Sequence, residues 1–254
     1  MIILYFTATG NSLYAAKRIG GDLLSIPQLV RQQRYEISDD VVGIVCLIYC
    51  GELPKLVSEY LRKSVIETEY FFAVLTYGMH ATNGRAHVAA LAEEAGRALD
   101  YSAEIRMVDN WLPGFDAREQ IETAAQKQIE KQIDDVCTNI AARKRNEVKI
   151  GFFKKAGMKM VHNAMARNIL KGTNAQNYIV NDSCNGCRVC ERLCPVRNIQ
   201  VIQKPVFSDH CEVCLACVHN CPQNAIHLPN EKSGARFRNE HISLKELIDS
   251  NGSF

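Results

Sequence analysis

Cysteine is the residue type in this 254-residue chain whose number and spacing most clearly indicate a chemistry. Eight of the eleven cysteines fall between Cys184 and Cys221, in two copies of the pattern Cys-x2-Cys-x2-Cys-x3-Cys-Pro that are 27 residues apart. Thiolates at this spacing are typical ligands of [4Fe–4S] clusters. The loop that carries the first three cysteines of a copy can wrap around one cluster. The fourth cysteine points away from this cluster and can reach the cluster of the other copy.

This crossing predicts two ligand sets, one of Cys184, Cys187, Cys190 and Cys221, and one of Cys211, Cys214, Cys217 and Cys194. Zinc sites, the alternative, usually pair two Cys-x2-Cys units across a longer spacer and often use histidine. The pattern resembles the bacterial two-[4Fe–4S] ferredoxins over about residues 176–230. Because four protein thiolates complete each cluster, no iron position stays open for a substrate, and electron transfer is the expected role.

The remaining composition is that of an ordinary globular protein, with 47% hydrophobic and 23% charged residues. A short secreted disulfide scaffold is excluded by the length, so we expect reduced thiols and a cytoplasmic location. No basic stretch precedes the apolar residues 1–4, as a secretory signal would require. The longest apolar runs, 41–50 and 70–77, are too short to span a membrane. We expect Cys46, Cys50 and Cys137 to be packing residues.

A second candidate site is the polar turn Thr7-Ala8-Thr9-Gly10-Asn11-Ser12, between an apolar segment and a predicted helix. Short hydroxyl side chains at a helix N-terminus can bind an anion through backbone N–H groups and the helix dipole. The same residue types also cap ordinary helices. The turn is not a Walker A loop, and it lacks the three-glycine pattern of nicotinamide sites.

Two further loops follow predicted parallel strands, Tyr49–Pro54 and Tyr77–Gly84. Ligands of open α/β sheets bind at such carboxyl ends, where the strand order switches. With the turn at 7–12, these loops resemble flavodoxin over about residues 1–142. The resemblance implies FMN, with its phosphate on the first turn and its ring between the other two loops.

Carried to this chain, the resemblance assigns the phosphate to Thr7, Thr9, Asn11 and Ser12. It leaves open whether Tyr49 or Tyr77 stacks on the ring, because no tryptophan lies in the second loop. Trp111 either borders the ring or anchors its own loop, and His80 is expected to face solvent. The full implied FMN site is Thr7, Ala8, Thr9, Gly10, Asn11, Ser12, Tyr49, Cys50, Gly51, Tyr77, Gly78, Met79, Gly84 and Trp111.

Strands and helices are predicted to alternate through the first 145 residues, which favours an α/β fold with a doubly wound parallel sheet. The flavodoxin-like version of this fold, followed by a ferredoxin-like domain, is what the resemblances imply. The expected strands are 1–6, 41–49, 70–77 and 101–108. The expected helices are 12–19, 54–62, 84–99 and 117–145.

Residues 143–171 differ in composition, with nine Lys and Arg against one acid. They are predicted to form a basic amphipathic helix, either packed as a linker or bound to a membrane surface or partner. The expected domains are 1–142 for FMN, 143–175 for the linker, 176–230 for the clusters, and a tail, 231–254, with a short helix near 244–248.

The order of these parts resembles a family of flavodoxin–ferredoxin fusion proteins. It implies a soluble electron-transfer protein that relays electrons between FMN and two [4Fe–4S] clusters and converts between one- and two-electron carriers. The alternative is a reductase whose small substrate meets the flavin edge near His80 and Trp111. A third reading, a redox sensor that contacts nucleic acid, lacks a recognisable binding module. We expect redox partner proteins, and no catalytic residue, nucleic-acid partner or membrane span.

Overall fold

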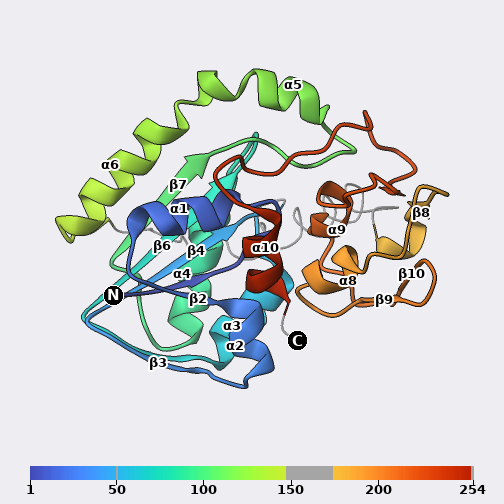
Figure 1. Ribbon diagram of the computed structural model, residues 1–254. Coiled ribbons are helices and arrows are strands. Elements are labelled where there is room, and N and C mark those ends of the chain that lie inside the picture. Colours follow the sequence, from blue (N-terminus) through green and yellow to red (C-terminus); the bar gives the residue numbers. More distant parts are fainter. Residues whose placement is uncertain (50, 147–173, 253–254) are drawn as a thin grey trace.

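The computed structural model describes residues 1–49, 51–146 and 174–252 (Figure 1). Its N-terminal part is a five-stranded sheet in the order β2-β1-β4-β6-β7, and every strand pairing in it is parallel. The strands are β1 (Ile2–Tyr5), β2 (Asp22–Ser25), β4 (Val41–Leu47), β6 (Tyr70–Tyr77) and β7 (Tyr101–Arg106). The prediction of an α/β fold with a parallel sheet is confirmed. Because β1 pairs with both β2 and β4, the strand order switches at β1, and the loops that follow β1 and β4 lie on either side of this switch.

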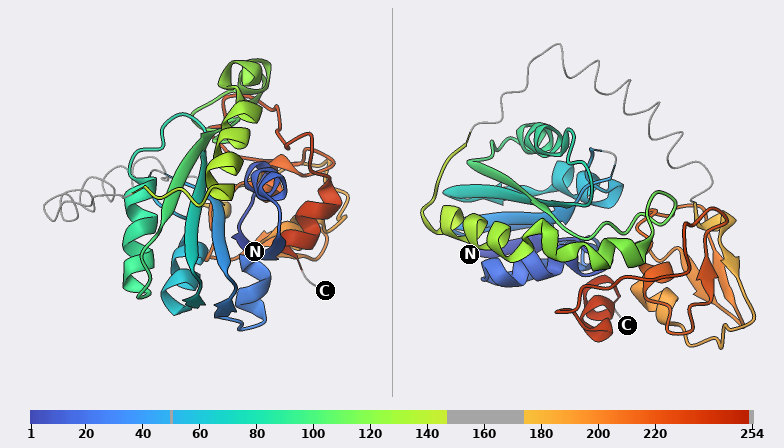
Figure 2. Two further views of the ribbon diagram at one scale, coloured as in Figure 1. Left: turned by 90° about the vertical axis from the view of Figure 1, so that its left-hand side faces the viewer. Right: turned by 90° about the horizontal axis from the view of Figure 1, so that it is seen from above.

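Helices cover both faces of the sheet, as the left view of Figure 2 shows. The helices α1 (Asn11–Ile19) and α6 (Ile129–Ala141) pack on one face, and α2 (Ile26–Arg31), α3 (Lys55–Lys63) and α4 (Gly84–Glu94) pack on the other. Each face has its own apolar core, which explains why β4 and β6 read as continuous apolar runs. The packed sheet therefore gives rigid support to the loops that follow the carboxyl ends of its strands.

Several local predictions differ from the structure. The expected helix 117–145 is divided into α5 (Ala117–Glu122), a 3-10 turn (Ala124–Lys127) and α6, because Gln128 has a left-handed backbone with φ 49°. The helix α4 ends at Glu94, before the left-handed Gly96, and does not reach residue 99. The strand β2 was not predicted, and β3 (Glu36–Ser38) and β5 (Val65–Glu67) form a separate parallel pair.

The C-terminal part consists of short elements around the cysteine loops. It contains a 3-10 turn (Ala175–Asn177), β8 (Ile179–Val180), α8 (Val189–Leu193), β9 (Ile199–Val201), β10 (Pro205–Phe207), α9 (Ala216–His219), β11 (Ile226–His227) and α10 (Leu244–Asn251). The strand β8 pairs with β11, and β9 pairs with β10, both antiparallel. The basic helix predicted within 143–175 lies almost entirely outside the described residues.

The 27-residue repeat recurs in the backbone. Three positions of the first copy have a left-handed φ, and so do their three equivalents in the second copy; the pairs are Gly186 and Val213, Arg188 and Leu215, and Arg197 and Asn224. A left-handed residue is rarely stable without surrounding constraints. Its recurrence at equivalent positions shows that the two cysteine loops share one conformation.

The predicted tail packs back onto both parts of the molecule. Its helix α10 begins with a capping box of Ser243 and Glu246 and lies between α2 and α8 (Figure 1). The Asn251 side chain donates to the carbonyl of Thr7 at 3.0 Å, and Asn239 N donates to the carbonyl of Thr9 at 2.8 Å. The tail thus supports the turn after β1 from behind. In the described ranges, no helix is both long and apolar enough to cross a membrane.

Candidate iron–sulfur and cofactor sites

The eight clustered cysteines line two small cavities of the C-terminal part. One cavity is lined by Cys184, Cys187, Cys190 and Cys221, and the other by Cys194, Cys211, Cys214 and Cys217. These are the two crossed sets that the spacing predicts, because the fourth cysteine of each copy lies in the other copy's cavity. Over the described ranges, no three His, Cys, Asp or Glu side chains converge to suit a single metal ion. The thiols instead surround a space, which is the arrangement that a cubane cluster requires.

Backbone N–H groups point at several of these sulfurs. Asn198 N lies 3.1 Å from Cys194 Sγ, and Ala225 N, its equivalent in the repeat, lies 3.3 Å from Cys221 Sγ. Val213 N lies 3.2 Å from Cys211 Sγ. Hydrogen bonds to ligand sulfurs stabilise the added negative charge of a reduced cluster and raise its potential. The donor set therefore fits an iron–sulfur cluster in each cavity.

The two sets differ in exposure. Cys214 and Cys217 are buried, whereas Cys187 is exposed. Burial raises the pKa of the Cys190 thiol to about 12 and the pKa of Cys214 and Cys217 well above the ordinary value. These thiols are neutral without metal, so cluster binding must displace their protons.

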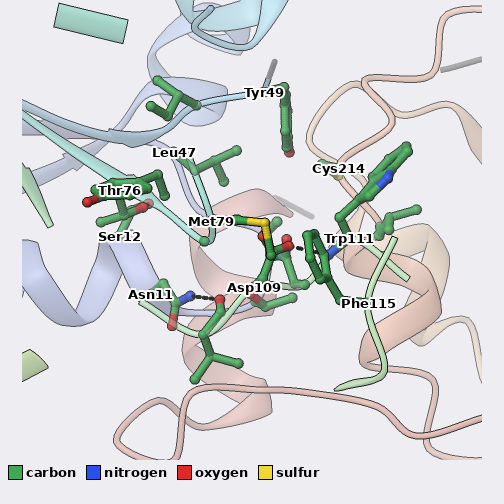
Figure 3. A pocket seen from close by; sticks show the side chains of 18 of the residues that line it. Asn11, Ser12, Leu47, Tyr49, Thr76, Met79, Asp109, Trp111, Phe115 and Cys214 are labelled. Carbon is green, nitrogen blue, oxygen red and sulfur yellow. Dashed lines mark hydrogen bonds between the residues drawn. The ribbon is translucent and has the colours of Figure 1, made fainter. Parts of the chain in front are cut away.

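A third cavity, of about 290 Å³, lies at the carboxyl ends of the parallel strands (Figure 3). This volume is near the lower end of the range for small-molecule sites. The predicted FMN residues that line it are Thr7, Ala8, Thr9, Asn11, Ser12, Tyr49, Tyr77, Gly78, Met79 and Trp111. Gly10, Gly51 and Gly84 do not line it, and Cys50 lies outside the described residues. The exposed His80 also lines the cavity.

The polar end of this cavity is the turn after β1. Thr7 Oγ1 accepts a hydrogen bond from Gly10 N at 3.2 Å, and Thr9 Oγ1 accepts one from Asn110 Nδ2 at 2.9 Å. Each hydroxyl thus keeps its own hydrogen available for a ligand oxygen. The first N–H groups of α1 have no acceptor within the helix, and its first turn has no acidic residue. A phosphate fits this end of the cavity.

Gly10 shapes the turn without lining the cavity. Its φ is 101°, which favours glycine, and an added Cβ would lie 3.0 Å from Asn239 Cβ in the C-terminal segment. Glycine here allows the turn and the C-terminal segment to pack closely.

The other end of the cavity is mainly apolar. Figure 3 places Trp111, Phe115 and Cys214 across the cavity from Asn11 and Ser12. The Tyr49 hydroxyl is buried and has no hydrogen-bond partner among the residues that the structure describes. A buried hydroxyl without a partner costs free energy, so this atom also points to a bound molecule. Aromatic side chains that line a cavity suit a planar ring system.

Asp109 lies in the wall of this cavity and was missed by the sequence analysis. Its Oδ1 accepts a hydrogen bond from Trp111 N at 2.9 Å, and burial raises its pKa from the ordinary value. A Cβ added to Gly78 would lie only 2.0 Å from Asp109 Oδ2. Glycine at position 78 therefore allows the carboxylate to lie beside the loop after β6.

Residues 176–235 match the 4Fe-4S dicluster domain family. No curated protein matches the chain. The matched segment holds all eight clustered cysteines, and the prediction of a ferredoxin-type iron–sulfur domain is confirmed. Such a domain indicates electron transfer by iron–sulfur clusters.

The dicluster domain also forms one wall of the third cavity. Val213, Cys214 and Leu215 line it together with the sheet loops, and Cys214 lines the second cysteine cavity as well. No pattern within a single segment signals this contact, because it joins positions that are about a hundred or more residues apart. Cys214 and Leu215 each line both cavities, and Cys214 is the cysteine that the two sites share.

Buried polar contacts hold this wall in place. Glu212 Oε1 accepts from Leu56 N at 2.9 Å and so satisfies an N–H of the first turn of α3. Burial lowers the pKa of His219 to about 4, so its ring is neutral at neutral pH. Its Nε2 then donates to the Asn110 carbonyl at 2.7 Å, while its Nδ1 accepts from Phe237 N at 3.1 Å. The dicluster domain is thus hydrogen-bonded to the start of α3 and to the loop after β7.

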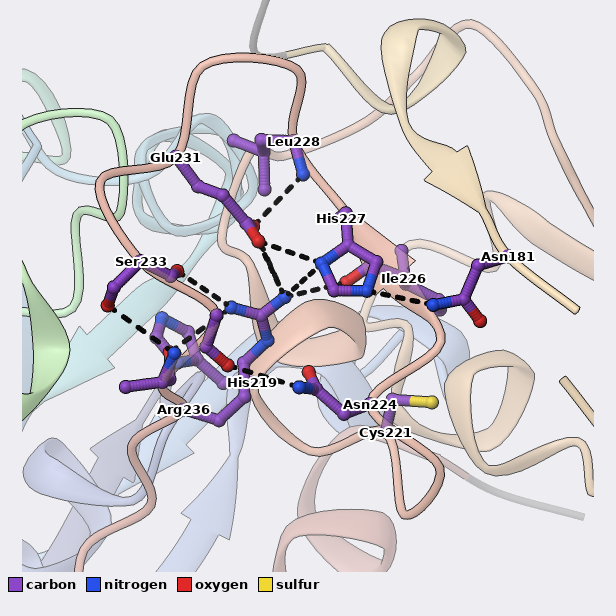
Figure 4. Close-up of polar contacts among 12 residues, drawn as sticks. Asn181, His219, Cys221, Asn224, Ile226, His227, Leu228, Glu231, Ser233 and Arg236 are labelled. Carbon is purple, nitrogen blue, oxygen red and sulfur yellow. Dashed lines mark hydrogen bonds and ion pairs between the residues drawn. The ribbon is translucent and has the colours of Figure 1, made fainter. Parts of the chain in front are cut away.

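A second, partly buried network lies beside Cys221 in the dicluster domain (Figure 4). Arg236 Nη2 donates to Glu231 at 3.1 Å and to the Ile226 carbonyl at 3.1 Å, and His227 Nδ1 lies 2.8 Å from Glu231. Burial acts to raise the pKa of Glu231, but hydrogen bonds from His227, Leu228 N and Arg236 outweigh it and lower the pKa. The carboxylate is therefore ionised at neutral pH and depends on these donors.

We expect Arg236→Met to lower the free energy of unfolding by about 2 kcal/mol, since it leaves the Glu231 carboxylate buried without its cation. Chemical denaturation of the cluster-loaded protein measures the loss. Arg238→Met, the same change at an exposed arginine nearby, is the control. The double variant Arg236→Met with Glu231→Gln should recover part of the loss. If Arg236→Met, Arg238→Met and the double variant all had the same free energy of unfolding, the role of the network would be contradicted.

Proposed function

We propose that this protein is an electron relay, in which an FMN-binding α/β part exchanges electrons with two [4Fe–4S] clusters in the same chain. One observation carries the proposal: Cys214, a ligand of the second cluster, also lines the cavity at the switch point of the sheet. A cofactor in this cavity would lie against a cluster ligand. Electron exchange between them needs no further protein.

The fold and the cavity support FMN. Numbered along the chain, the five sheet strands have the order 2-1-3-4-5, which is that of flavodoxin-like folds, whose FMN lies at the switch between the first and third strands. Here that switch lies between β1 and β4, and the hydroxyls of Thr7 and Thr9 and the start of α1 lie beside it. The buried Tyr49 hydroxyl and the aromatic end suit the ring of the same molecule.

Each part of the proposed relay can be assigned to residues of this chain. FMN supplies an acceptor for one or two electrons, whereas each cluster carries one at a time. Thr7, Thr9 and the N–H groups of α1 would hold the phosphate, and Trp111 and Phe115 would help to exclude water from the ring. Cys214 and Leu215 would place the second cluster beside that ring. The first cluster, whose ligand Cys187 is exposed, is then the terminus that faces solvent.

Cofactor content and stepwise reduction test the proposal. Protein purified without oxygen should contain one FMN and about eight irons per chain. A reduced ferredoxin should reduce the clusters first and the flavin afterwards, in one chain and at a rate independent of protein concentration. The proposal is refuted if FMN does not bind or if the flavin is reduced before the clusters. Turnover of a small oxidant faster than free FMN supports would instead favour the reductase.

Asp109 should set a pH dependence of the flavin potential. A carboxylate at the cavity wall disfavours added electrons, so Asp109→Asn should raise the midpoint potential of bound FMN. Because burial raises the pKa of Asp109, the carboxyl is neutral below that pKa and charged above it. The difference between wild type and variant should therefore appear as pH rises through this pKa and vanish at lower pH. Redox titrations at several pH values measure it, with Asp116→Asn as the control in the same loop.

A further inference from the structure

A fourth cavity, of about 800 Å³, lies on the dicluster domain where it meets α2 and the end of α10. Four arginines line it, Arg31, Arg188, Arg192 and Arg197, and its lining includes a single acid, Glu191. We call it the arginine cavity. Its positive charge is concentrated in a concave surface, which strengthens its field toward an approaching anion.

Two of these arginines, Arg31 and Arg188, keep donors that contacts inside the molecule do not use up. Arg31 Nη1 donates to the Asn251 carbonyl at 2.8 Å, but its Nε and Nη2 are buried and have no hydrogen-bond partner in the described part of the chain. Arg188 Nη2 donates to the Val201 carbonyl at 3.2 Å, and Arg188 Nε lies 3.8 Å from Glu191 Oε2 in a loose ion pair. The Arg188 side chain is nevertheless 63% exposed. Guanidinium groups with free donors favour carboxylates, which they can bind with two hydrogen bonds.

The arginine cavity also reaches both clusters. Cys187, a ligand of the first, and Cys194, a ligand of the second, are among its lining residues. Cys187 is exposed, so this is a surface at which an outside electron carrier can approach a cluster closely.

The repeat relates this surface to the proposed FMN cavity. Cys187 and Arg188 of the first copy are equivalent to Cys214 and Leu215 of the second, and each pair lines a cavity next to its own cluster. Cys214 and Leu215 line the cavity between the sheet loops and the dicluster domain, whereas Cys187 and Arg188 line the arginine cavity and are exposed to solvent.

We propose that the arginine cavity is the docking site of an acidic, single-electron carrier protein, whose carboxylates bind the arginines and whose redox centre approaches Cys187. This rests on the proposed relay, because it assigns the partner of the solvent-facing cluster. Arg31 is half-buried, and a role in offsetting the negative charge of the clusters would suit it. This role does not explain the exposed Arg188 and Arg197, whose charges are screened by water.

The test measures how fast a reduced, acidic two-[4Fe–4S] ferredoxin reduces the clusters in stopped flow. Arg188→Glu with Arg197→Glu should lower the second-order rate constant about tenfold or more at low ionic strength and flatten its salt dependence. Lys131→Glu with Arg143→Glu, on and after α6, changes the net charge equally at a remote exposed surface and should change the rate less than twofold. Iron content checks folding, and Arg188→Gln with Arg197→Gln is the milder pair if charge reversal impairs it.

Several results would overturn the proposal. Equal rates in the variant and control pairs would show that docking occurs elsewhere. If the variant pair were reduced more slowly only because the midpoint potentials of its clusters had shifted, the arginines would serve to offset the negative charge of the clusters and not to dock a partner. Inhibition by inorganic phosphate beyond that of chloride at equal ionic strength, with unchanged salt dependence in the variants, would indicate a small-anion site. Because cluster reduction is the readout, failure of the relay into FMN leaves this test interpretable.

Discussion

Cys214→Ala should lower the iron content from about eight to about four per chain. It should also abolish electron flow into the sheet cavity. The substitution removes a proposed ligand of the second cluster, and this cysteine also lines the sheet cavity. The first cluster keeps all four of its cysteines and should still be reduced by a ferredoxin. Flavin reduction should fall to the rate that free FMN shows with the same donor.

Two comparisons make this result specific. Cys187→Ala, at the equivalent position of the repeat, should also leave about four irons, but in the second cluster. Cys137→Ala, a cysteine of α6 outside both cavities, should change neither iron content nor flavin reduction. Iron analysis and stopped-flow spectra of the flavin measure both effects. Undiminished flavin reduction in Cys214→Ala would show that electrons reach the cavity by another route.

Gly78→Val should weaken FMN binding by about 100-fold or more, equivalent to about 2.7 kcal/mol. The added Cβ would lie 2.0 Å from Asp109 Oδ2 and 2.4 Å from Asp109 Cβ, and neither atom can move freely. Trp111 N holds the carboxylate in place, so relief of the clash must displace the loop that carries Trp111. The cavity wall then moves out of position.

Titration of FMN into flavin-free protein, followed by quenching of flavin fluorescence, measures this affinity. Gly234→Val is the matched control, because a Cβ at Gly234 meets no atom within 4 Å. Both variants should retain their iron, which separates a local change from unfolding. Wild-type affinity in Gly78→Val would mean that the ligand does not bind beside Asp109.

Features that depend on local spacing were predictable from the sequence. The crossed cysteine sets follow from intervals of three and four residues, and β4 and β6 follow from apolar runs that are buried on both faces. The strand β2 was missed because its four residues, Asp22–Ser25, include only two apolar ones. The break at Gln128 was missed because the apolar spacing continues across it.

Features that depend on contacts between distant segments could not be predicted in this way. Leu215 reads as an ordinary residue of a cysteine loop, yet it forms part of the sheet cavity. Asp109 reads as a loop residue, and only its burial beside Gly78 shows its place in the site. The Asn251 side chain supports the turn after β1 from a separation of 244 residues. Periodicity and spacing carry no information about such pairings.

In the proposed relay, the wall made by Val213, Cys214 and Leu215 would make binding of FMN depend on the second cluster. These residues belong to the loop that wraps the second cluster, so oxygen damage to this cluster would loosen one side of the flavin cavity. A chain that loses its cluster would then release its flavin as well. Assembly of the proposed relay would also have an order, because the loop of Val213, Cys214 and Leu215 would complete the FMN cavity only after it had closed around its cluster. A partly assembled chain would thus be unable to hold a reactive flavin that has no acceptor.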